Sequence, residues 1–154
     1  MDKENILMRI QDCGIVAVVR AESADKAERI VDACMEGGVA AIELTFSVPH
    51  ADRVIETLSY KYDPKDIILG AGTVMDAATA RIAMLSGAQY IVSPYLDLET
   101  LRMCNRYRVP MMPGVMSVRE AVTAMENGAD ILKIFPGDLF GPKIIKDILG
   151  PIPY

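Results

Sequence analysis

The stretch Gly38-Val39-Ala40-Ala41-Ile42-Glu43 decides the fold, because the same form occurs three times along the chain. In each case a glycine that can stop a helix is followed by a small residue and then by an apolar run typical of a strand. The other two stretches are Gly87-Ala88-Gln89-Tyr90-Ile91-Val92 and Gly128-Ala129-Asp130-Ile131-Leu132-Lys133. This weak internal repeat indicates successive βα units.

Short strands and longer helices alternate around these repeats. The predicted strands are mostly apolar on both faces, as in a parallel sheet covered by helices: residues 15–20, 40–45, 66–71, 89–93, 109–112 and 130–135. The predicted helices follow them: residues 24–36, 49–60, 76–86, 98–106, 117–127 and 140–149. Ser23 is a suitable N-cap for the first of these helices, and Gly37 and Gly38 end it.

Two architectures fit this order of elements. An open doubly wound sheet would be expected to carry a dinucleotide-binding fingerprint, and the nearest match, residues 70–75, lacks the third glycine and does not follow the first strand. We therefore favour a (β/α)8 TIM barrel, of which about six βα units are present in this chain. Residues 1–154 are expected to form a single barrel domain that lacks the last two βα units.

Composition excludes several classes of function. The chain is 51% hydrophobic and 24% charged, and its net charge of −5 disfavours nucleic-acid binding. No apolar run approaches the roughly 20 residues that span a bilayer, and residues 1–9 lack the apolar core of a signal peptide, so we expect a cytoplasmic protein without membrane association. The scattered Cys13, Cys34 and Cys104 and the single His50 argue against a disulfide framework and a zinc site.

The active site of a parallel barrel forms where the strands end, so polar residues at those positions are the candidates. They are Arg20, Glu43, Thr45, Thr73, Ser93 and Lys133. Lys133 is flanked by apolar residues, and a lysine in a covered strand is costly unless it is paired or neutral. Desolvation lowers the pKa of a lysine and favours the free amine, which attacks a ketone to give a carbinolamine and then an iminium. The residues alone leave open a structural lysine paired with Glu43.

Glu43 interrupts a second apolar strand, and a buried carboxylate must find a partner or carry a proton. If it meets Lys133, the two form a coupled pair that can shuttle protons, and a simple ion pair is the alternative. Arg20 at the end of the first strand suits an anionic carboxylate, although a solvated arginine fits as well. The glycines before Thr73 allow either close approach of a ligand or a tight turn. Pro94 follows a strand and stiffens its loop.

At these residues the sequence resembles the 2-keto-3-deoxy-6-phosphogluconate (KDPG) and 4-hydroxy-2-oxoglutarate (KHG) aldolase family. EGGVAAIELT at 36–45 resembles the family's catalytic-glutamate segment, and GADILKIFPG at 128–137 is similar to its Schiff-base segment. GAGTV at 70–74, IVSP at 91–94 and MPGV at 112–115 match intervening blocks in the right order. Any one block is weak evidence, whereas five in order are strong.

The resemblance implies a (β/α)8 barrel that assembles as a homotrimer and uses no metal or organic cofactor. It implies that Lys133 forms an imine with pyruvate or the keto-acid substrate, and that Glu43 transfers protons directly or through a water. The implied reaction is reversible cleavage of KDPG to pyruvate and glyceraldehyde 3-phosphate. The residues implied to bind substrate are Arg20, Thr73, Phe135 and Pro94.

The sequence departs from the family in two places. Many members have an arginine two residues after the threonine of the glutamate motif, and here Ser47 stands there, which leaves more of the carboxylate binding to Arg20. The family also continues with two more strands and a glycine-rich phosphate-binding region that this sequence does not contain. The alternatives are a KHG or 2-keto-3-deoxy-6-phosphogalactonate aldolase, a non-catalytic truncated form, and a phosphosugar isomerase or epimerase on the same fold.

Overall fold

A computed structural model describes residues 2–153. The strands are β1 (Ala17–Val19), β2 (Ala41–Thr45), β3 (Ile68–Gly72), β4 (Tyr90–Val92), β5 (Met111–Met112), β6 (Gly114–Val115) and β7 (Lys133–Ile134). The helices are α1 (Lys3–Cys13), α2 (Ala24–Glu36), α3 (Ala51–Lys61), α4 (Ala77–Leu85), α5 (Leu98–Arg106), α6 (Val118–Glu126) and α7 (Lys143–Leu149).

All strand pairs are parallel, in the order β1-β2-β3-β4-β5, with β6 paired to β7. Pro113 alone separates β5 from β6, and proline has no N–H to give to a ladder. The two short strands therefore form one interrupted strand, whose first half pairs with β4 and whose second half pairs with β7. This arrangement gives six parallel barrel strands, as the alternating pattern predicts. Within residues 2–153, β1 and β7 each have one unpaired edge.

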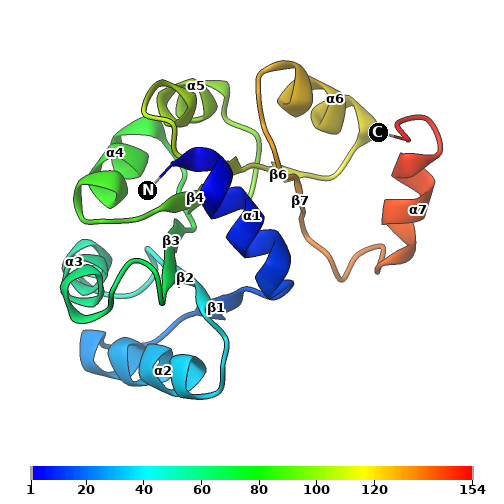
Figure 1. Ribbon diagram of the computed structural model, residues 1–154. Coiled ribbons are helices and arrows are strands. Elements are labelled where there is room, and N and C mark those ends of the chain that lie inside the picture. The colour runs from blue at the N-terminus through cyan, green and yellow to red at the C-terminus, as the bar shows by residue number, and fades with distance from the viewer. Residues whose placement is uncertain (1, 154) are drawn as a thin grey trace.

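Two apolar clusters show that the strands curve around an interior. One lies between the strands and the surrounding helices and contains Ile42, Leu44 and Ile91. The other lies inside the barrel and contains Tyr90 and Val92, whose side chains alternate with that of Ile91. Helices α2 to α6 surround the strands, and the ring is open between α2 and α7 (Figure 1).

Helix α1 plugs the interior, and the sequence patterns did not predict it. Its Ile6 and Ile10 are buried against the inner faces of the strands, which contributes about 1.5–3 kcal/mol for each side chain. Lys3 fixes the start of the helix through an ion pair with Asp130 at 2.6 Å and a hydrogen bond to Asn105 Oδ1 at 3.2 Å. In Figure 1 α1 crosses in front of the strands.

The glycines of the repeated stretch have the predicted role. Gly38, Gly87 and Gly128 follow α2, α4 and α6 and have φ angles of 84°, 110° and 89°, which glycine adopts at little cost. Each turns the chain from a helix into the next strand. Ser23 caps α2 by accepting a hydrogen bond from the Lys26 amide at 3.3 Å, as predicted.

Several predicted boundaries are wrong, among them the starts of the strands predicted over residues 15–20, 66–71 and 109–112, which each begin two residues later. The helix predicted over residues 49–60 begins at Ala51, because His50 has a φ of 56° that an α-helix cannot contain. The strand predicted over residues 130–135 is limited to Lys133–Ile134, because it pairs on only one side. The last helix begins at Lys143 rather than at residue 140. No helix within residues 2–153 is long and apolar enough to cross a membrane.

Candidate active site

Strands β2 and β7 bring Glu43 and Lys133 together across the interior. Glu43 lies on the inner face of β2, because Ile42 and Leu44 on either side of it pack toward the helices. Its Oε1 lies 3.6 Å from Nζ of Lys133, which is an ion-pair contact slightly too long for a hydrogen bond. The pairing that the sequence offered as one possibility is therefore present.

Two glycines of β3 make room for this arrangement. A Cβ added to Gly72 would overlap the carboxyl group of Glu43, and one added to Gly70 would overlap the ring of Tyr90. Gly70 is in register with Glu43 on one side and with Tyr90 on the other. The sequence suggested ligand approach or a tight turn for these glycines. The structure shows instead that they lie within β3 and accommodate the side chains of neighbouring strands.

Burial dominates the electrostatics of Glu43, whose side chain is only 4% exposed. This burial raises the pKa of Glu43 above its usual value, and the positive charges of Lys133 and Arg20 oppose the rise without cancelling it. A raised pKa makes the carboxylate a better proton acceptor, and the carboxyl group can afterwards return the proton, which suits general acid–base catalysis.

Lys133 is less buried than the sequence suggests. The prediction placed it in a strand covered on both sides, but its side chain is 26% exposed. The reason is that β7 pairs only with β6 among residues 2–153, so one flank of Lys133 is open. On another side Nζ lies 5.3 Å from the centre of the Phe135 ring, within range of a cation–π contact.

The other predicted substrate-binding residues also follow the carboxyl ends of the strands. Arg20 is exposed directly after β1, and its charge acts on Glu43. Thr73 is half-buried directly after β3, and the carbonyl of Pro94 packs against Gly114 of β6. These positions place a positive charge and a hydroxyl at the same end of the barrel as Lys133.

Two of the polar strand-end candidates have structural roles. Thr45 is fully buried and donates a hydrogen bond from Oγ1 to the carbonyl of Val19 at 3.0 Å, which ties β2 to β1. Ser47 Oγ lies 2.7 Å from the same hydroxyl. Ser93 is buried, and its hydroxyl accepts a hydrogen bond from the Tyr95 amide at 3.4 Å. These contacts assign both buried hydroxyls to the scaffold.

Tyr90 is the interior residue that the sequence reasoning missed. It is fully buried on the inner face of β4, and its hydroxyl and Oε1 of Glu43 are the buried side-chain polar atoms of residues 2–153 without a hydrogen-bond partner. The available signal was its alternation with Ile91, which places a polar aromatic residue inside the barrel. Because it begins β4, it is not among the polar residues at strand ends that the barrel architecture marks as candidates.

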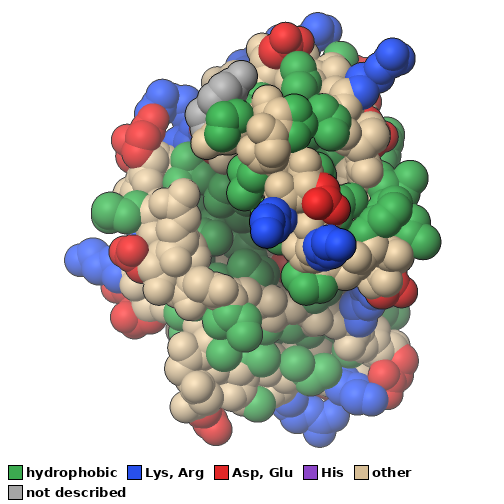
Figure 2. Space-filling view, turned by 90° about the vertical axis from the view of Figure 1, so that its right-hand side faces the viewer, with side chains coloured by type: hydrophobic (Ala, Val, Ile, Leu, Met, Phe, Trp, Pro, Cys, Tyr) green, Lys and Arg blue, Asp and Glu red, His purple; other side chains and the backbone are tan. Residues whose placement is uncertain are grey.

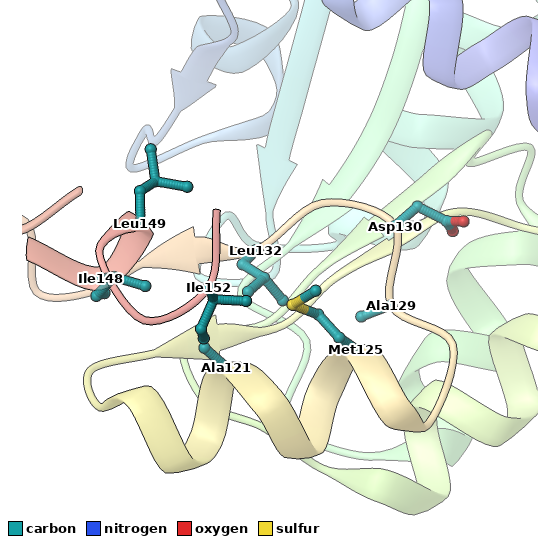
Figure 3. Close-up of a pocket in the computed structure, with 8 residues that line it drawn as sticks. All are labelled: Ala121, Met125, Ala129, Asp130, Leu132, Ile148, Leu149 and Ile152. Atoms are coloured by element: carbon teal, nitrogen blue, oxygen red, sulfur yellow. The ribbon is translucent and has the colours of Figure 1, made fainter. Parts of the chain in front are cut away.

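A large apolar cavity lies elsewhere in the described residues. It has a volume of about 460 Å³, and Figure 3 shows it between α6, α7 and the outer side of β7. Leu132 and Ile148 line it, whereas Glu43 and Lys133 do not, so it is not the candidate active site. Figure 2 shows that this side of the molecule is hollowed and that hydrophobic side chains line the hollow. Residues 2–153 contain no group of three or more His, Cys, Asp or Glu side chains that could hold a metal ion.

Comparison with known proteins points to one family. The family of KDPG and KHG aldolases matches residues 6–154. The 2-dehydro-3-deoxy-6-phosphogalactonate aldolase of Escherichia coli is 34% identical over 139 residues, which cover 90% of this chain and 67% of the relative. The 2-dehydro-3-deoxy-phosphogluconate aldolase of Treponema pallidum is 33% identical over 136 residues, which cover 88% of this chain and 64% of the relative.

Solved structures agree with the fold. A KDPG aldolase from Legionella pneumophila, in which pyruvate was captured as a covalent carbinolamine intermediate, superposes with a TM-score of 0.83 at 28% identity. The match covers 90% of this chain and 66% of that structure. The chain thus spans about two thirds of the length of these relatives. The predicted α/β barrel class, with about six of its βα units in this chain, is confirmed.

Proposed function

Because the chain belongs to the KDPG and KHG aldolase family, we propose that its site performs class I aldol cleavage through a Schiff base on Lys133. The observation that carries the proposal is the 3.6 Å contact between Lys133 Nζ and Oε1 of the buried Glu43. An amine nucleophile and a proton-transfer group within reach of one another are what imine chemistry requires.

The proposed reaction begins when the free amine of Lys133 attacks the ketone carbon of a 2-keto acid. Loss of water from the carbinolamine gives an iminium, which draws the electron pair of the breaking carbon–carbon bond into an enamine. Glu43 takes the proton of the substrate hydroxyl as the aldehyde leaves, and it returns a proton to the enamine carbon. Hydrolysis of the resulting iminium releases pyruvate and restores the amine.

The substrate would lie at the carboxyl ends of the strands. Arg20 would bind the carboxylate of the keto acid, because a guanidinium there matches a carboxylate in charge and geometry. Thr73 would offer a hydroxyl, and Phe135 and Pro94 would provide apolar contacts. We propose a phosphorylated 2-keto-3-deoxy sugar acid as substrate, since relatives named for the gluconate and for the galactonate isomer match at 33% and 34% identity.

A coupled assay for pyruvate tests this function. The 154-residue chain would be given the phosphogluconate, the phosphogalactonate and 4-hydroxy-2-oxoglutarate, and pyruvate would be followed through lactate dehydrogenase. We expect pyruvate from at least one of them, none from Lys133→Met, and a normal rate from Lys146→Met, which removes an exposed lysine of α7. Failure of the unaltered chain to release pyruvate from any of them would overturn the proposal. An isomerase or epimerase would also release none.

Three further expectations stay predictions. They are the single barrel domain over residues 1–154 without the last two βα units, the homotrimeric assembly and the cytoplasmic location. The catalytic roles assigned above to Lys133 and Glu43 are likewise part of the proposal.

A further inference from the structure

Tyr90 and Glu43 share an enclosed position inside the barrel. Glu43 on β2, Gly70 on β3 and Tyr90 on β4 are in register, so their side chains project from one row on the inner face. The middle residue has no side chain, and the ring of Tyr90 lies over it with the hydroxyl-bearing carbon closest. Gly70 therefore places no side chain between the Tyr90 ring and the Glu43 side chain.

The two groups are an unsatisfied hydrogen-bond donor and an unsatisfied acceptor. The Tyr90 hydroxyl and Glu43 Oε1 are both buried, and neither has a hydrogen-bond partner within residues 2–153. Buried polar atoms in folded proteins are nearly always hydrogen-bonded to protein or to ordered water. Burial, with the charge of Glu43 as the next contribution, raises the pKa of Tyr90 well above its usual value, so the phenol keeps its proton and is a donor.

The spacing fits one bridging water. The tip of the Tyr90 ring lies over Gly70 and Oε1 of Glu43 lies over Gly72. Residues two apart on one face of a strand are separated by about 6.6 Å. A water with two hydrogen bonds of about 2.8 Å each spans most of that distance, and the phenolic C–O bond covers part of the rest.

We propose that Tyr90 is a positioning residue for Glu43, acting through one internal water that its hydroxyl and Oε1 of Glu43 hold between them. The water accepts a hydrogen bond from the phenol and donates one to the carboxylate, which stabilises the ionised form of Glu43 and directs the carboxyl group toward Lys133. The consequence for catalysis rests on the proposed aldolase function, whereas the hydrogen-bonded link does not.

The charged and titratable groups around the pair are few. Lys133 from β7 and Arg20 after β1 act on Glu43, and Cys13 at the end of α1 acts on Tyr90. Both cations favour the carboxylate, and within residues 2–153 neither makes a hydrogen bond to the phenol. Removal of the Tyr90 hydroxyl is therefore expected to shift the titration of Glu43 without changing any other charge.

The test compares Tyr90→Phe, which keeps the ring over Gly70, with Tyr60→Phe, which removes a phenol that is 83% exposed. Carbon-13 NMR of labelled glutamate, assigned with Glu43→Gln, would report the pKa of Glu43. We expect Tyr90→Phe to raise this pKa by about one unit, the size of one hydrogen bond to a charged group, and Tyr60→Phe to leave it unchanged.

A second readout uses the proposed chemistry without needing a phosphate site. Exchange of the pyruvate methyl protons in D2O reports enamine formation, and under the proposed mechanism we expect its rate to rise with pH as Glu43 ionises. In Tyr90→Phe we expect this rise to move to higher pH by the same amount, with the KM for pyruvate unchanged.

The outcomes separate the two proposals. An unshifted Glu43 titration in Tyr90→Phe overturns the link between the residues, whatever the activity. A shifted titration supports the link even if the unaltered chain exchanges no pyruvate protons, and in that case the aldolase function fails alone. A shifted titration with an unshifted rate profile overturns the role of Tyr90 in catalysis.

Discussion

Replacing Gly72 by alanine tests whether the missing side chain at this position leaves the space that the Glu43 carboxyl group occupies. The added Cβ would overlap Oε1, Cδ and Cγ of the Glu43 side chain. The backbone itself tolerates alanine, because Gly72 lies within β3 and is not among the residues with positive φ. The effect of the substitution is therefore a local collision with the carboxyl group.

The magnitude follows from the packing. Glu43 is 3% exposed, so its side chain cannot swing into solvent without breaking the contact with Lys133. Inserting one methyl group into a packed interior of this kind destabilises a protein by about 1–3 kcal/mol. Displacing a general acid–base group slows a reaction by about 10²–10⁴-fold, so we expect pyruvate release to fall by that factor.

A double-mutant cycle separates this explanation from general damage. Urea unfolding at neutral pH would be measured for the unaltered chain, Gly72→Ala, Glu43→Ala and the double variant. Because Glu43→Ala removes the atoms that collide, the second substitution should cost little in that background, which gives a coupling energy of about 1–3 kcal/mol. Equal destabilisation by Gly72→Ala in both backgrounds would refute the reasoning.

Three further predictions concern ionisation and helix capping. Because the pKa of Glu43 is raised in the folded chain, the protonated carboxyl group stabilises the fold below the unfolded pKa of 4.5, and this contribution is lost as the pH rises through the higher folded pKa. The stability of Glu43→Gln relative to the unaltered chain should therefore increase between pH 4 and neutrality. A difference in urea midpoints that stays constant over this range would contradict this. The hydrogen bond that the Tyr62 hydroxyl donates to Asp32 is the main cause that raises the pKa of Tyr62 to about 12. In an ultraviolet titration, Asp32→Ala should therefore lower the pKa of one tyrosine toward 10, and an unchanged titration curve would contradict this. Ser117→Ala removes the capping box at the start of α6 and should cost about 1 kcal/mol in the same unfolding assay, whereas no measurable loss would show that the cap does not stabilise α6.

The sequence predicts the order of elements well, because that order depends on local signals. The helices over Ala24–Glu36 and Leu98–Arg106 have the predicted bounds, since each has a side-chain N-cap directly before it, Ser23 and Asp97, and an apolar stripe along one face. Helix α1 was not predicted, because it is stabilised by docking Ile6 and Ile10 into a barrel formed by distant strands. The sequence does carry local signals for this helix, namely Asp2 as N-cap, Gly14 in a left-handed conformation at its end and the i, i+4 spacing of Ile6 and Ile10, but a single short helix depends on tertiary packing for most of its stability.

The site was predicted to the extent that it follows from strand ends. Lys133 and Glu43 each interrupt an apolar stretch that was predicted to be a strand, and in a parallel barrel side chains on the inner faces of such strands can meet. The roles of Gly70, Gly72 and Tyr90 depend on which residues lie opposite one another in adjacent strands. Sequence patterns do not specify that register. The exposure of Lys133 depends likewise on what pairs with the outer edge of β7.

The most direct test of the central claim is to trap the imine on Lys133. The 154-residue chain would be incubated with pyruvate and sodium borohydride, which reduces an iminium to a stable secondary amine, and then digested for mass spectrometry. We predict one pyruvate adduct, located on Lys133, that is retained in Lys146→Met and lost in Lys133→Met. Absence of an adduct on the unaltered chain, or an adduct on a different lysine, would contradict the account.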